Sequence, residues 1–153
     1  MKFSEMKYER PDLDVLKKQI ADLTEALKNA KNYEEARSLF VEKDKIDRHV
    51  KSLSTLTYIR HSIDTRDEFY DEEMNFWNAA GPELMEYDEQ WTRTLLASEY
   101  KNKLAEEFGE VVFINAELEL KTFKPELVPL MQKENDLVTE YDKLIANSKI
   151  DFR

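Results

Sequence analysis

One of the two histidines in the chain stands beside a dense run of carboxylates, in the stretch RHSIDTRDEFYDEE at residues 60–73. Imidazole and carboxylate side chains bind transition metals and transfer protons in enzymes. A zinc peptidase carries them as H-E-x-x-H, which sets two imidazoles and a general base on one helix. Here Ser62 follows His61 and Val50 follows His49, so neither histidine begins that motif.

Two other kinds of metal site are excluded by spacing. Di-iron bundles use Glu-x-x-His pairs, but Ile46 and Tyr58 stand three residues before the two histidines. A calcium loop places aspartates at alternating positions around a central glycine, and residues 64–73 contain no glycine. An acidic bundle that binds a cation is therefore the weakest functional hypothesis, because no set of ligands converges.

The same stretch has the features of a helix start. Thr65 and Glu68 match the T-x-x-E capping box. We expect His61 and Asp64 to fix the turn that precedes this helix. Carboxylates in the first turns of a helix are stabilised by its dipole and face water. We interpret four residues in this way: Asp67, Glu68, Asp71 and Glu72.

Two further features could serve a ligand. The amide of Asn115 both donates and accepts, so it could bind a peptide backbone; we favour the alternative, a buried asparagine bonded to a neighbouring helix. Six aromatic residues could line a channel, although their spacing is typical of a helix core: Phe69, Tyr70, Phe76, Trp77, Tyr87 and Trp91. We retain His61, Phe69 and Asn115 as substrate-channel candidates and predict no catalytic, cofactor-binding or metal-ligating residue in this chain.

Composition and charge reduce the number of possible fold classes and binding partners. The 153 residues fit one domain, and two glycines and four prolines leave few places for turns, which favours long helices. The absence of cysteine excludes disulfides and thiolate chemistry. A formal charge of −10 opposes binding to nucleic acid or anionic lipid. No signal peptide or membrane span is recognisable, so we expect a cytoplasmic protein.

The first half of the chain predicts a long helical hairpin. A lead-in segment, residues 1–10, ends at Pro11, and an apolar stripe then recurs at helical spacing through Leu13, Leu16, Ile20, Leu23, Leu27 and Ala30. Asn32, with Glu35 three residues later, is the expected N-cap of the second helix. So short a connection makes the two helices antiparallel. Lys43 interrupts the second stripe, and we expect its ammonium to reach water.

The second half predicts further helices. The apolar face of the third segment continues across Gly81-Pro82, where we expect a kink or two stacked helices. Ser98 is the expected start of the next segment, and residues 111–123 are predicted to be helical because they lack a partner strand. The last helix opens at Lys124-Pro125 and carries Leu127, Leu130, Leu137, Tyr141 and Leu144. The result is an all-α bundle of five to seven antiparallel helices, forming a single domain over residues 1–153.

Several strings in order resemble a known family: MKFSEMKYERPD, IRHSIDTRDEFYDEE, GPEL, NAELELKTFKPEL and TEYDKLIANSKIDF. They resemble the start of oligoendopeptidase F, among the thimet-oligopeptidase-like (M3) zinc metallopeptidases. The resemblance runs from Met1 to Arg153 but covers only about the first quarter of a typical member. It implies an all-α, two-lobed enzyme that hydrolyses short peptides in a deep channel. The zinc motif of the family lies outside this stretch, so no zinc ligand is transferred to any position here.

Two hypotheses remain open. In the first, the chain is the N-terminal lobe of a zinc oligopeptidase, whose partners are short peptides and the catalytic lobe of the same polypeptide. Alone it would hydrolyse nothing, would expose an apolar patch where the other lobe belongs, and could self-associate through that patch. In the second, it is a freestanding acidic helical module that offers a groove to a partner helix.

Overall fold

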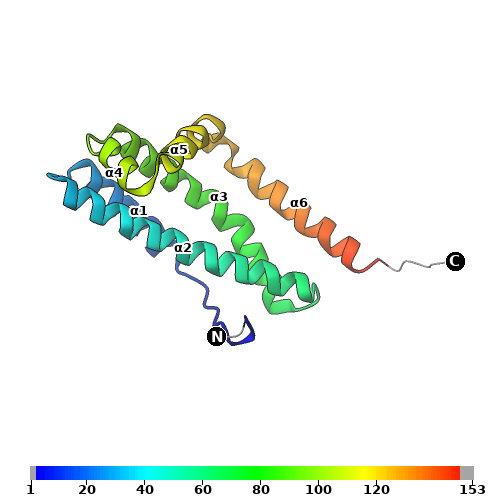
Figure 1. The fold of residues 1–153 in the computed structure, drawn as a ribbon. Helices are drawn as coiled ribbons and strands as arrows, with labels where there is room; N and C mark the ends of the chain where they lie inside the picture. The colour runs from blue at the N-terminus through cyan, green and yellow to red at the C-terminus, as the bar shows by residue number, and fades with distance from the viewer. Residues whose placement is uncertain (1–2, 149–153) are drawn as a thin grey trace.

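In the computed structural model of the protein, which describes residues 3–148, every regular element is a helix (Figure 1). This confirms the predicted all-α bundle. No helix in the described part combines the length and hydropathy needed to cross a bilayer. The elements in chain order are η1 (Phe3–Glu5), α1 (Leu13–Lys28), α2 (Tyr33–Ile63), α3 (Glu68–Ala97), α4 (Lys101–Phe108), α5 (Glu110–Thr122), η2 (Pro125–Leu127) and α6 (Val128–Ala146).

The predicted hairpin of α1 and α2 is confirmed, and capping explains its ends. The Asp12 carboxylate accepts hydrogen bonds from two backbone N–H groups of the first turn of α1. Asn32 caps α2 by accepting from the Glu35 N–H at 2.9 Å, and the Glu35 carboxylate accepts from the Lys31 N–H at 2.9 Å. Both helices pack on α3, which lies between them and α6 (Figure 1).

The main core forms where the first five α-helices meet. Its spacing in α1 is that of one apolar stripe, as the sequence predicts. Among the described residues, α6 adds none to this cluster. The buried members are Leu16, Ile20, Leu23, Leu27, Ala36, Leu84, Trp91, Leu95, Leu104 and Phe113.

One expectation about α3 is wrong, and one of two alternatives for it is excluded. The helix does not start at a Thr65 cap: Asp67 is the N-cap and accepts from the Tyr70 N–H. Of the two alternatives at Gly81-Pro82, two stacked helices are excluded, because α3 continues through Pro82 as one helix. Proline deprives the carbonyl four residues earlier of its helical donor. That carbonyl belongs to Asn78, and the Asn135 side chain of α6 donates to it at 3.1 Å.

The segment after α3 is helical as predicted, but it is divided. Ser98 closes α3, and α4 begins at Lys101. Gly109, with φ of 101°, separates α4 from α5; that backbone region favours glycine. The burial pattern also changes there, since Leu104 is buried but Val111 and Leu118 are exposed. Alanine, glutamate and leucine on both sides favour helix and so hide the break.

Candidate functional site

A groove runs along α3 where α2 and α5 flank it, and a buried lysine forms its base. Lys43 of α2 is 4% exposed, and its Nζ lies 2.6 Å from Asp47 Oδ1 and 2.8 Å from Asp88 Oδ1. Burial alone would lower the pKa of Lys43, but the two carboxylates outweigh it and raise that pKa. The expectation that Lys43 reaches water is therefore wrong, because carboxylates on α2 and α3 compensate its charge inside the fold.

The part of the groove above this ion pair is acidic with aromatic walls. Asn115 lies there and is exposed, so the favoured interpretation of it as a buried, bonded asparagine is wrong. Phe40 and Trp91 contribute apolar surface, and the carboxylates come from Asp44, Asp47, Asp88 and Glu119. Such a surface can accept hydrogen bonds and attract cationic groups, whereas Asn115 can also donate.

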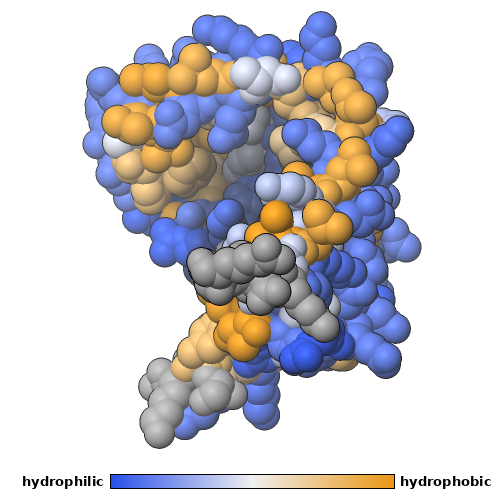
Figure 2. Space-filling view, turned by 90° about the vertical axis from the view of Figure 1, so that its right-hand side faces the viewer, coloured by the Kyte–Doolittle hydropathy of each residue, from blue (hydrophilic) through white to orange (hydrophobic). Residues whose placement is uncertain are grey.

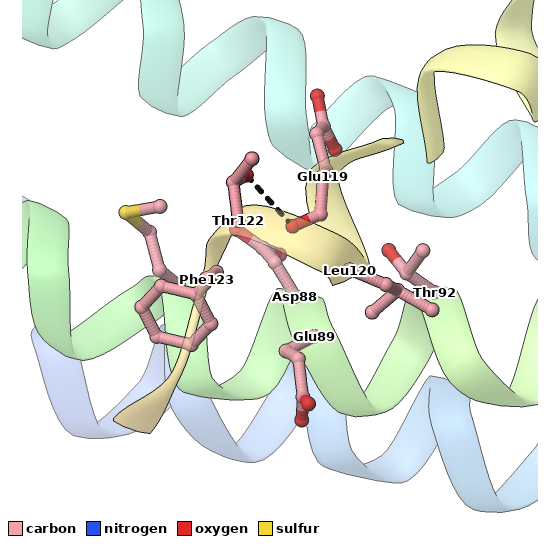
Figure 3. Close-up of a pocket in the computed structure, with 8 residues that line it drawn as sticks. Asp88, Glu89, Thr92, Glu119, Leu120, Thr122 and Phe123 are labelled. Carbon is pink, nitrogen blue, oxygen red and sulfur yellow. Dashed lines mark hydrogen bonds between the residues drawn. The ribbon is translucent and has the colours of Figure 1, made fainter. Parts of the chain in front are cut away.

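Asp88 also belongs to an adjoining cavity of about 300 Å³ between α3 and α5 (Figure 3). The wall on α5 includes Glu119, whose carbonyl accepts from the Thr122 hydroxyl at 3.0 Å. Phe123 closes the cavity after α5 ends. Asp88, Thr92 and Glu119 line both cavities, so the two lie next to each other along the α3–α5 contact.

The other two channel candidates lie elsewhere. His61 is 3% exposed near the end of α2, with Nε2 3.3 Å from Asp71 Oδ1. Lys143 of α6 contacts the same oxygen, so Asp71 joins three helices rather than facing water. Phe69 is exposed and packs edge-on against Tyr70. A rise of 1.5 Å per residue sets Lys43 and His61 about 27 Å apart along α2, so the three candidates do not form one site.

A second polar cluster, missed by sequence reasoning, anchors the lead-in segment on α3. Glu73 is 3% exposed and accepts from Arg10 Nη2 at 2.7 Å and from the Tyr8 hydroxyl at 2.5 Å. Burial alone would raise the pKa of Glu73, yet these two donors lower it. Burial and the bond to Glu73 raise the pKa of Tyr8 to about 12. The sequence does contain a signal for the burial of Glu73: it lies on the same helix face as Phe69 and Phe76, between them in the apolar stripe.

The arrangement contains groups that can bind and orient but no set that could hold a metal. Within residues 3–148, no three histidine, aspartate or glutamate side chains come together for an ion. The residues present therefore do not fit a zinc centre, which needs three or four converging ligands. His61 has one carboxylate nearby, that of Asp71 at 3.3 Å from Nε2. What the site can do is hold a polar or cationic chain against an acidic wall.

Apolar side chains also gather on the outside of the molecule, over α5 and α6. Seen from the end where α6 stops, they border a hollow (Figure 2). The most exposed of them on these helices are Val111, Ile114, Leu118, Leu130, Leu137, Val138, Tyr141, Leu144 and Ile145. Clusters of this kind mark surfaces that another molecule or domain covers.

Comparison with known proteins identifies the fold. The sequence profile of the peptidase M3 N-terminal domain matches residues 3–123. No curated protein matches the chain. PZ peptidase A, solved with an inhibitor, shares 36% identity and superposes with a TM-score of 0.94 over 99% of this chain and 27% of its own.

Two proteins assigned as oligoendopeptidase F are equally similar. The one from Bacillus anthracis is 35% identical, with a TM-score of 0.95 over 100% of this chain and 28% of its own. The other is also 35% identical, with the same TM-score, and is matched over 27% of its length. The chain thus spans little more than a quarter of these relatives. It belongs to the peptidase M3 family and corresponds to the N-terminal region of an oligoendopeptidase F-like protein.

Proposed function

We propose that this chain is the N-terminal helical lobe of a zinc-dependent oligopeptidase and that it shapes the channel in which short peptides bind. The observation that carries the proposal is the superposition of the whole chain on the peptidase relatives at 35–36% identity. The family membership supplies peptides as the substrate class. The acidic groove supplies a surface on this lobe suited to them.

The division of labour follows from the residues present. Zinc, when bound to the catalytic lobe, would activate a water molecule for peptide hydrolysis. No described side chains of this chain fit that metal. The lobe is instead proposed to bind and orient substrate, and its partner is the catalytic lobe of the same polypeptide. We place the protein in the cytoplasm and predict that the chain alone hydrolyses nothing.

The groove offers distinct contacts to a peptide. The Asn115 amide can donate to a backbone carbonyl and accept from a backbone N–H. The side chains of Asp88 and Glu119 face the same space and can attract a cationic group. Lys43 is held inside the fold by its ion pairs and serves to fix α2 against α3. His61 and Phe69 remain channel candidates at the opposite end of α2.

The alternative, a freestanding acidic interaction module, draws support from the apolar side chains exposed on α5 and α6. Its groove would receive a partner helix rather than a substrate. The match to one quarter of longer peptidase-family chains favours the lobe. The two proposals differ in their expected activity: the lobe proposal expects the extended protein to hydrolyse short peptides, and the module proposal expects binding of a partner helix without hydrolysis.

A matched pair of asparagine variants tests the channel role in the protein extended to its native C-terminus. Asn115→Ala removes an amide from the groove, whereas Asn102→Ala removes one from the exposed surface of α4. Loss of a hydrogen bond worth about 1 kcal/mol raises KM for short peptides about fivefold. We expect that for Asn115→Ala, with kcat little changed, and no effect for Asn102→Ala.

Equal kinetics for both variants would remove Asn115 from the channel. The 153-residue chain serves as a second test, incubated with the same peptides and added zinc. No cleavage is expected. Cleavage by this chain that a zinc chelator abolishes would contradict its assignment as a lobe without the zinc site.

A further inference from the structure

Helix α6 packs on α3 through polar side chains. Asn78 of α3 donates from Nδ2 to the Thr139 hydroxyl at 3.0 Å, and Asn135 of α6 donates to the Asn78 carbonyl at 3.1 Å. Gln132 donates to the Ala79 carbonyl at 3.0 Å. Asn78 and Thr139 are both buried. A buried polar contact of this kind specifies one placement of the helix, since each group would be costly to leave unpaired.

The proline of α3 accounts for this placement. Pro82 has no N–H for the Asn78 carbonyl, which therefore needs a donor from elsewhere. Asn135 supplies that donor. The polar side of α6 is thus turned toward α3 by a requirement of the α3 backbone. The apolar side of α6 is necessarily turned away.

The opposite side of α6 is apolar and exposed. We call it the outer face; its residues recur at helical spacing and are 52–68% exposed: Leu130, Leu137, Val138, Tyr141, Leu144 and Ile145. In a globular protein a stripe like this normally faces a core. Here these side chains are exposed instead.

The relatives show that the placement of α6 is not peculiar to the 153-residue chain. Helix α6 comprises 19 of the 153 residues, about 12% of the chain. If it were placed differently in the relatives, the TM-scores could not reach 0.94 and 0.95 over 99–100% of the chain. In those proteins almost three quarters of the polypeptide lies outside the matched part. Polypeptide is therefore available there to cover the same face.

We infer that the polypeptide that follows residue 153 in the full-length protein packs on the outer face of α6. Helix α6 is then shared: its polar side binds α3, and its apolar side enters the core of the next lobe. This inference rests on the proposed function, because it takes the catalytic lobe as the occupant. A second copy of the chain is the competing occupant.

The absence of cysteine makes the inference testable by thiol labelling. Leu144→Cys reports on the outer face, where the side chain is 68% exposed. Gln19→Cys on the exposed side of α1 is the matched control. Each is made in the 153-residue chain and in the full-length protein, and labelling of the peptide that contains the new thiol is followed by mass spectrometry. Hydrogen exchange of α6 in the unsubstituted proteins provides a readout that needs no variant.

We expect the L144C thiol to react at least tenfold more slowly in the full-length protein than in the 153-residue chain, with Q19C unchanged and α6 exchanging more slowly. Equal reactivity of L144C in both proteins would overturn the inference. So would a full-length protein that protects L144C only as a dimer, because a second copy would then cover the outer face. Peptide hydrolysis measured on the same full-length sample separates the proposals: activity with an open outer face refutes the docking alone, and protection without activity refutes the peptidase assignment alone.

Discussion

Helices α1 and α6 lie on either side of α3 and carry similar apolar stripes (Figure 1). The stripe of α1 is buried, whereas the stripe of α6 is exposed. In α1, Leu16 and Ile20 are 6% and 2% exposed. In α6, Leu137 and Leu144 are 55% and 68% exposed. A periodic stripe therefore establishes which side of a helix is apolar, but not whether that side faces the neighbouring helix. On α6, a carbonyl left open by Pro82 and the polar groups around it determine the facing side.

The largest contrast is expected from truncating one residue on each stripe. Ile20→Ala should lower the free energy of unfolding by about 2–5 kcal/mol, because it opens a cavity in the core. Leu144→Ala should change it by less than about 0.5 kcal/mol in the 153-residue chain, because the side chain is already in water. Urea unfolding followed by circular dichroism measures both. Comparable losses in the two variants would show that α6 belongs to the same core as α1.

A buried charge, the Glu73 carboxylate that binds Tyr8 and Arg10 of the lead-in segment, should also contribute to stability. Glu73→Gln weakens hydrogen bonds to a buried carboxylate and should cost about 1–3 kcal/mol at pH 7. The pKa of Glu73 is lower in the folded state than its ordinary value of 4.5. Its contribution is therefore present above pH 4.5 and is lost as the pH falls through the folded-state pKa.

Stability curves against pH check this prediction, with Glu106→Gln on the exposed side of α4 as the control. The wild type and the E73Q variant should converge in acid, whereas the control should follow the wild type throughout. A constant gap between wild type and E73Q down to pH 2 would mean that the charge of Glu73 is not what stabilises the anchor.

The α3–α6 contact should respond locally rather than globally. Asn135→Ala leaves the Asn78 carbonyl without its donor and should cost about 1–2 kcal/mol. Hydrogen exchange should accelerate in α6 and remain unchanged in α1, because α6 contributes nothing to the main core. Equal acceleration in both helices would argue that the two regions unfold as one unit.

The smallest effect is a coupling energy between Pro82 and Asn135. Pro82→Ala restores an N–H that can bond to the Asn78 carbonyl, so the Asn135 donor becomes less necessary. In the P82A background, Asn135→Ala should therefore cost about 1 kcal/mol less than in the wild type. A double-mutant cycle on unfolding free energies measures the difference. Strict additivity would remove the proline as the reason for the orientation of α6.

The sequence predicted those parts of the fold that depend on local pattern. The Asn32 cap, the α1–α2 hairpin and the helical state of residues 111–123 follow from spacing and propensity within one segment. It did not predict the break at Gly109, because good helix formers flank it. Nor did it predict the burial of Lys43, because the compensating Asp88 lies on another helix.

The candidate site was less accessible to such reasoning. Asn115 was judged buried because apolar residues surround it at helical spacing, and its exposure follows from the turn at Gly109. The contact of His61 with Asp71, which Lys143 of α6 also contacts, was not predicted because it depends on packing between distant segments. Family resemblance supplied a function that the groove residues alone do not specify, because carboxylates and an amide can serve many kinds of site.

The most direct test of the central claim is peptide hydrolysis by the protein extended to its native C-terminus, measured beside the 153-residue chain. The account predicts that the extended protein cleaves short peptides, that a zinc chelator abolishes the cleavage and added zinc restores it, and that the 153-residue chain is inert. An extended protein that folds, retains zinc and cleaves no peptide would contradict the account.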